Sequence, residues 1–161
     1  MSECSVVPKA ELRDLAEWLA SWPWPLKESA VLDLVASRGW QVMSHDAGNA
    51  IEWETGLVGS RPWAHVTLID GVVSRAGVTM SEVLPEKSAE SAAFLRDVFA
   101  DQVATVSELL GPPAERKPGV RAAARWLLPS GAALRIGLGL SCTWSLRSPE
   151  FVQIEAGLGR R

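Results

Sequence analysis

The sequence has no tyrosine, only two cysteines and only two histidines, and these scarcities exclude several classes of protein. Cys4 and Cys142 cannot form a disulfide framework, so we expect reduced thiols and a cytoplasmic protein. A net charge of −3 supplies no basic field for phosphate groups, so nucleic acid is not an expected partner. No apolar run approaches the roughly 18 residues of a membrane span, and no membrane association is expected.

The rest of the composition is that of an ordinary globular protein. Hydrophobic residues make up 47% of the chain and charged residues 22%. A chain of 161 residues can bury a sizeable core without disulfides or metal, so we interpret residues 1–161 as a single domain. Tryptophan is the one unusual abundance, with eight residues in the chain.

Residues 9–38 predict a pair of helices. Apolar residues recur at spacings of three and four over residues 9–21 and again over about 26–38. Between these two stretches lies the sequence SWPWP, in which each proline removes an N–H donor and stops a helix. We therefore expect two short amphipathic helices joined by a rigid corner.

The remainder of the chain predicts strands on either side of one long helix. Residues 40–80 have a hydrophobic period of two and an Asp-Gly hairpin turn at 70–71. The long helix is expected at about 88–110, and a second strand group at about 120–158, with residues 151–158 as its last strand. This order favours an α+β fold: a twisted antiparallel β-sheet packed by the N-terminal helical pair and one long central helix.

The polar residues show no pattern typical of a catalytic or metal site. His45 and His65 lack the spacing of metal ligands, and no serine lies in a nucleophile elbow. The GLGL glycines fall within an alternating strand and precede no helix, so they do not predict a phosphate-binding loop. We expect no catalytic residue, metal or cofactor. An enzyme whose catalytic residues are scattered along the sequence stays open as a third alternative.

Glu52 and Glu54 lie two residues apart on a predicted strand, so their carboxylates face the same side. A separation of roughly 7 Å would suit the paired carboxylates of a glycosidase. The same spacing arises wherever a half-buried strand turns its charged side to water, and this solvated face is the favoured interpretation. An acidic patch that binds a partner is the second.

Seven of the eight tryptophans fall into two groups. Four lie on apolar faces or follow a helix cap and are predicted to belong to the core: Trp40, Trp53, Trp126 and Trp144. The other group comprises Trp22, Trp24 and Trp63, each of which is next to a proline at the boundary of an element. Such a tryptophan either covers the edge of the core or anchors a binding partner, and we favour the first role at each position.

A helix ending in W-x-W, the segment ESAVLDLVASRGWQV and the later strand–helix–strand order resemble an uncharacterised family of small actinobacterial proteins over nearly the whole chain. Proteins of this type resemble immunity proteins, which neutralise polymorphic or specialised-secretion toxins. The resemblance implies a non-enzymatic cytoplasmic domain that binds and inhibits a cognate toxin. An α+β secretion chaperone that holds an effector segment by strand addition is the alternative. The residues expected to bind the protein partner are Glu52, Glu54, Trp22, Trp24, Trp63 and His65.

Overall fold

The computed structural model describes residues 6–57, 63–84 and 88–158, and these form four helices and eight strands. In chain order the elements are α1 (Lys9–Ala20), α2 (Glu28–Ser37), β1 (Gln41–Asp46), β2 (Ala50–Glu54), β3 (Trp63–Ile69), β4 (Val72–Thr79), α3 (Ala89–Leu110), β5 (Glu115–Lys117), β6 (Ala123–Leu127), β7 (Ala133–Leu138), β8 (Cys142–Arg147) and α4 (Pro149–Leu158).

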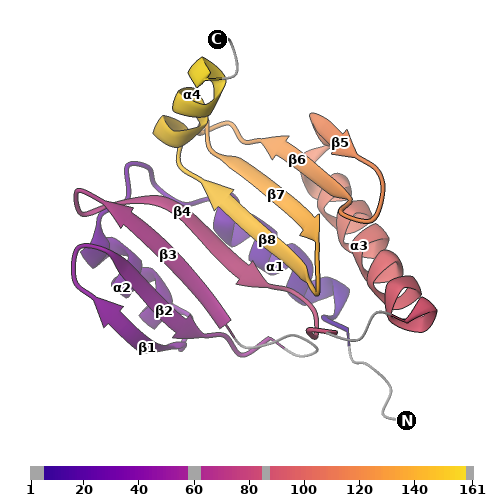
Figure 1. The fold of residues 1–161 in the computed structure, drawn as a ribbon. Helices are drawn as coiled ribbons and strands as arrows, with labels where there is room; N and C mark the ends of the chain where they lie inside the picture. Colours follow the sequence, from indigo (N-terminus) through magenta and orange to yellow (C-terminus); the bar gives the residue numbers. More distant parts are fainter. Residues whose placement is uncertain (1–5, 58–62, 85–87, 159–161) are drawn as a thin grey trace.

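The strands form one antiparallel sheet in the order β1-β2-β3-β4-β8-β7-β6-β5. Each half of the sheet is a four-stranded meander that follows a helix in the chain. The two meanders meet through their last strands, β4 and β8, in the middle of the sheet (Figure 1). The fold therefore has the plan of two similar halves placed edge to edge, although the sequence shows no repeat.

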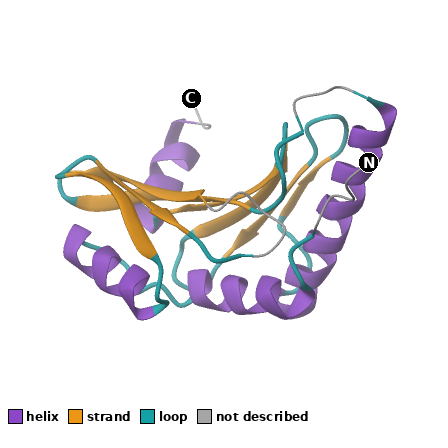
Figure 2. Ribbon diagram, turned by 90° about the horizontal axis from the view of Figure 1, so that it is seen from below, coloured by secondary structure: helices purple, strands orange, loops and turns teal. Residues whose placement is uncertain are grey.

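The helices cover the two faces of the sheet unequally. Helices α1, α2 and α3 lie on one face, and the short helix α4 stands on the opposite face near one end of the strands (Figure 2). The core lies between the sheet and the three helices, where Trp53, Trp144, Leu134 and Ile136 are almost completely buried. Most of the other face carries polar side chains and stays uncovered; we call it the open face.

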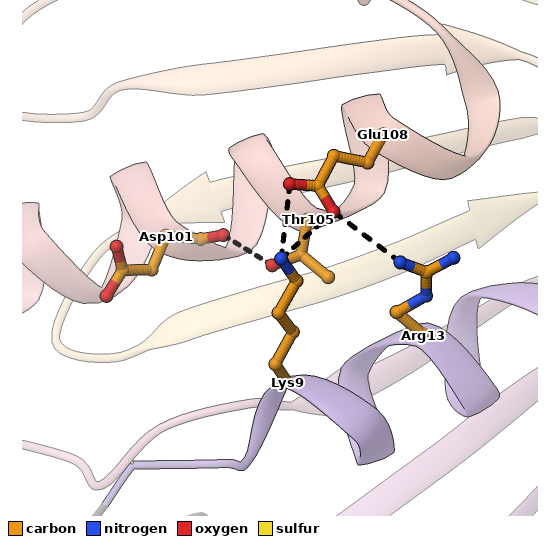
Figure 3. A network of polar contacts seen from close by, with 5 residues as sticks. All are labelled: Lys9, Arg13, Asp101, Thr105 and Glu108. Carbon is orange, nitrogen blue, oxygen red and sulfur yellow. Dashed lines mark hydrogen bonds and ion pairs between the residues drawn. The ribbon is translucent and has the colours of Figure 1, made fainter.

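Helices α1 and α3 are in contact and also linked by ion pairs (Figure 3). Glu108 on α3 lies 3.0 Å from the Lys9 Nζ and 3.5 Å from the Arg13 Nη1, both on α1. Thr105, next to this cluster, donates a hydrogen bond of 2.9 Å to the carbonyl oxygen of Asp101. Exposed ion pairs contribute little to stability, so they orient two helices that apolar burial already holds together.

A buried glutamine connects α3 to the centre of the sheet. Gln102 is 2% exposed, and its Nε2 donates to the Met80 carbonyl oxygen at 2.9 Å. Its Oε1 accepts hydrogen bonds from the Trp144 Nε1 at 2.7 Å and from the Cys142 thiol at 3.2 Å. Burial raises the pKa of the Cys142 thiol to about 12, so this cysteine stays protonated and packs as part of the core.

The α+β fold predicted from the sequence is confirmed, together with the N-terminal helical pair and the long central helix. The hairpin turn is also confirmed, because Asp70 and Gly71 both have positive φ, at 53° and 76°. The second strand group begins earlier than the predicted position of about residue 120, since β5 (Glu115–Lys117) pairs with β6.

The prediction of a strand at residues 151–158 is wrong, because this segment belongs to helix α4. The Ser148 Oγ accepts a hydrogen bond of 3.1 Å from the backbone N–H of Phe151, as a helix N-cap does. Pro149 occupies the first position of the helix, where its missing N–H costs nothing. The sequence Ser-Pro-Glu at 148–150 therefore starts a helix, while the short apolar run after it fits a strand and a helix equally well.

The SWPWP segment is a corner whose tryptophans pack on one another. Trp22 is 2% exposed, Trp24 is half-buried, and their ring centroids lie 6.0 Å apart. Trp18 on α1 makes edge-to-face contacts with Trp22 at 5.2 Å and with Trp40 at 5.3 Å. The Arg38 guanidinium lies over the rings of Trp18 and Trp40, at 4.9 and 4.7 Å from their centroids. The corner therefore covers the edge of the core.

Replacing Trp22 with alanine is expected to lower the free energy of unfolding by about 3–5 kcal/mol, because a buried aromatic side chain is lost and a cavity remains. Trp24→Ala, which removes a half-buried ring from the same corner, should cost clearly less. Urea unfolding followed by circular dichroism measures both values. Equal losses for the two variants, or a Trp22→Ala protein as stable as the wild type, would contradict this account of the corner.

Candidate functional site

The open face of the sheet carries charges that change sign from one half to the other. Strand β2 contributes the carboxylates of Glu52 and Glu54, and both side chains are exposed. The arginines of this face lie on β4, β6, β7 and β8. Strands alternate their side chains between two faces, so the buried residues between these positions form the core on the helical side.

The acidic half of the open face forms a surface that we call the β1–β3 patch, which consists of Met43, Glu52, Glu54, Trp63 and His65. In the pairing of β2 with β3, Glu52 is opposite His65 and Glu54 is opposite Trp63. Met43 and Trp63 are 56% and 54% exposed, and both line the same hollow, so the patch combines apolar surface with its charges. A hollow of about 250 Å³ lies among Met43, Glu52, Trp63 and His65.

His65 lies directly over a glycine of the neighbouring strand. A Cβ atom at Gly77 would be only 2.5 Å from the His65 Cε1, so the imidazole occupies space that any other residue at position 77 would fill. Desolvation of the ring and, second, the positive charge of Arg75 lower the pKa of His65, while Glu52 opposes this shift. The histidine is thus held mainly in its neutral form at the border between the acidic and basic halves.

The basic half of the open face contains four arginines, Arg75, Arg125, Arg135 and Arg147, which we call the arginine cluster. Arg75 and Arg147 are directly opposite each other across β4 and β8, as are Arg125 and Arg135 across β6 and β7. Burial and the charges of the other three arginines lower the pKa of Arg147. A hollow of about 480 Å³ lies between strands β5 to β8 and helix α4, and three of the four arginines line it: Arg125, Arg135 and Arg147.

The structure brings together four of the six residues predicted to bind a partner. Glu52, Glu54, Trp63 and His65 lie side by side in the β1–β3 patch. The other two belong to the tryptophan corner of the helical layer, and they are Trp22 and Trp24. The sequence reasoning missed the arginine cluster, whose only signal was an arginine at the polar position of several alternating strands.

The two histidines do not converge on one site. His45 on β1 contacts the carboxylate of Glu28 at the start of α2, on the helical side of the sheet. The His45 contact and, second, a hydrogen bond of 2.9 Å from the Gly48 N–H to the same carboxylate lower the pKa of Glu28. Among the residues that the structure describes, no three His, Cys, Asp or Glu side chains are grouped to hold a metal ion.

Fold and surface together define an α+β protein with an eight-stranded antiparallel sheet, whose open face is acidic in one half and basic in the other. The chain belongs to the family of unknown function DUF6301, whose family model matches residues 10–148. Neither the curated proteins nor the solved structures gave a match to the chain. Within the described ranges, no helix is long and apolar enough to cross a bilayer.

The position of His65 leads to a titration with opposite effects in two variants. Its pKa should lie below 6.5, rise in Arg75→Gln and fall further in Glu52→Gln, as measured by the NMR shifts of the imidazole. Since the unfolded chain binds this proton more tightly than the folded one, stability should decrease as the pH falls below about 6.5. A His65 pKa that is the same in both variants as in the wild type would contradict the placement of His65 between Arg75 and Glu52.

Proposed function

We propose that the protein acts by binding another protein, as an immunity protein that covers the active surface of a cognate secreted toxin. The observation that carries this proposal is the composition of the β1–β3 patch. Two large exposed apolar side chains, Met43 and Trp63, lie beside the carboxylates of Glu52 and Glu54 on the part of the open face that α4 does not cover. Aromatic and methionine side chains beside polar groups are typical of the centre and rim of protein interfaces.

The hollow of the β1–β3 patch suits a basic side chain from the partner. A lysine or arginine inserted there would reach the carboxylate of Glu52 while its alkyl chain packs between Met43 and Trp63. His65 adds no competing positive charge, because its lowered pKa keeps it mostly neutral near pH 7.

Charge supports a basic partner over an acidic one. The protein has a net charge of −3, so long-range attraction favours a partner with a positive surface and speeds its association. A toxin that attacks nucleic acid needs such a surface to hold phosphate groups. An inhibitor that places carboxylates on the positive surface of such a toxin would pair with the basic groups that hold phosphate, and would thereby exclude the nucleic acid.

A second candidate function, a secretion chaperone, is favoured by strand β1. This strand forms one edge of the sheet, and all six of its residues, Gln41–Asp46, are exposed. Edge strands can pair with an extended segment of another chain by adding a strand. A β-bulge between Val42 and Ser44 interrupts the regular pairing of β1 with β2, and irregular edges accept an added strand less readily. We therefore rank this function second.

Reversing both charges, in Glu52→Lys/Glu54→Lys, should weaken binding to the cognate toxin by about tenfold or more, equivalent to roughly 1.4 kcal/mol. Calorimetric titration measures the affinity, and survival of cells that express the toxin measures inhibition. The matched control is Asp97→Lys/Asp101→Lys, which reverses two exposed carboxylates on α3 on the other side of the sheet.

The two candidate functions give different results in the same experiment. An immunity protein binds the folded toxin and abolishes its activity, and the reversal in the β1–β3 patch removes both effects while the α3 control keeps them. A chaperone binds an unfolded segment of the effector and leaves the toxin active. Equal affinity of the wild type and the Glu52/Glu54 variant for the toxin would remove the β1–β3 patch from the binding surface.

A further inference from the structure

The arginine cluster places like charges opposite each other on paired strands, which lowers the stability of the sheet. Arg75 faces Arg147, and Arg125 faces Arg135, each as directly opposite residues of antiparallel strands. Like charges in such positions destabilise a sheet. Arg147 on β8 is opposite Ala133 on β7, and Ala133 is two residues before Arg135. Arg147 and Arg135 are therefore diagonal neighbours, and they connect the two pairs. Four guanidinium groups therefore follow one another across β4, β8, β7 and β6.

The carboxylates nearby compensate only part of this charge. Glu155 on α4 pairs with Arg147, and Glu115 on β5 lies 3.6 Å from the Arg125 Nη1. Arg75 and Arg135 form no ion pair within the part of the chain that the structure describes. The cluster thus keeps two uncompensated positive charges, and burial and repulsion by the other arginines lower the pKa of Arg147.

The space in front of the cluster has the size and lining of a small-molecule site. The hollow of about 480 Å³ falls within the range of roughly 300–1,000 Å³ that is usual for ligand pockets. Arg125, Arg135, Arg147 and the two glutamates supply its polar lining. Its apolar lining comes from the sheet and from α4, through Leu127, Ala133, Val152 and Ala156.

A glycine beneath the cluster lets one of the guanidinium groups lie close to the sheet. A Cβ atom at Gly137 would be 2.5 Å from the Arg135 Nη1, so a larger residue there would push this group outward. The Arg135 side chain therefore lies over its own strand, next to Arg125 on the neighbouring strand. The planar guanidinium group presents its N–H donors in a fork that suits the oxygen atoms of phosphate.

We propose that the arginine cluster and helix α4 form a binding site for a small phosphate monoester with an apolar substituent. The phosphate accepts hydrogen bonds from Arg135 and Arg147 and neutralises the uncompensated charge of Arg135. The substituent packs against Leu127 and Val152. A phosphate fits better than a single carboxylate because it offers more oxygen acceptors to Arg135 and Arg147, and because Arg75, opposite Arg147 on β4, adds an uncompensated positive charge beside the hollow. Helix α4 limits the space over the cluster, which favours a small molecule over a peptide segment.

Calorimetric titration of the intact protein with three probes at constant ionic strength and pH 8 tests this proposal. Phenyl phosphate should bind best, inorganic phosphate more weakly, and benzoate weakest, because it has the ring but only one charge. Arg135→Gln and Arg147→Gln should each lower the affinity for phenyl phosphate by about tenfold or more, since each removes a charged hydrogen-bond donor. Arg96→Gln, which removes an exposed arginine on α3, is the matched control and should change nothing.

Two further measurements separate a binding role from a structural one. Without ligand, Arg135→Gln should be at least as stable as the wild type, because it relieves repulsion within the cluster. Glu155→Gln should raise the affinity for phenyl phosphate by about threefold or more, because Arg147 loses its internal competitor. A structural cluster would instead lose stability in Arg135→Gln, and Glu155→Gln would leave the affinity unchanged.

Three outcomes overturn the proposal. The first is the absence of phenyl phosphate binding at millimolar concentration, and the second is equal loss of affinity in Arg96→Gln and Arg135→Gln. The third is binding of an acidic hexapeptide without binding of phenyl phosphate, which would assign the cluster to a protein partner. The site does not depend on toxin binding, so Glu52→Lys/Glu54→Lys should still bind phenyl phosphate.

Discussion

The pairing of β4 with β8 is the contact on which the rest of the structure depends. It joins two four-stranded meanders into one sheet, and each meander alone would leave that edge unpaired. The same pairing places Val78 opposite Trp144 on the helical face and Arg75 opposite Arg147 on the open face. One register therefore builds the centre of the core and half of the arginine cluster.

The unequal cover of the sheet explains why its two faces differ in chemistry. Three helices bury one face, and Gln102 fixes the longest of them to Met80, Cys142 and Trp144 through hydrogen bonds in the core. The other face receives only α4, so its side chains could remain charged and exposed. A protein that binds partners or ligands through a sheet needs such an uncovered face, and here its two halves carry opposite charges.

The β1–β3 patch could be predicted in part, because strand alternation already puts Glu52 and Glu54 on one polar side and Trp53 on the other. The sequence could not show that Trp63 is exposed and Trp22 buried, since both lie beside a proline at an element boundary. The difference is one of surroundings: Trp22 is enclosed by Trp18 and Trp24, whereas Trp63 begins a strand on the open face.

The sequence by itself determined the local elements: the helical pair and its proline corner, the Asp-Gly hairpin, the long helix and the α+β class, because these follow from periodicity and from residues that stop or turn the chain. Only the tertiary structure decided that Arg75 meets Arg147 and that α4 stands over the arginine cluster. The physical reason is distance along the chain: β4 and β8 are separated by a helix and three strands, and no local pattern encodes their register.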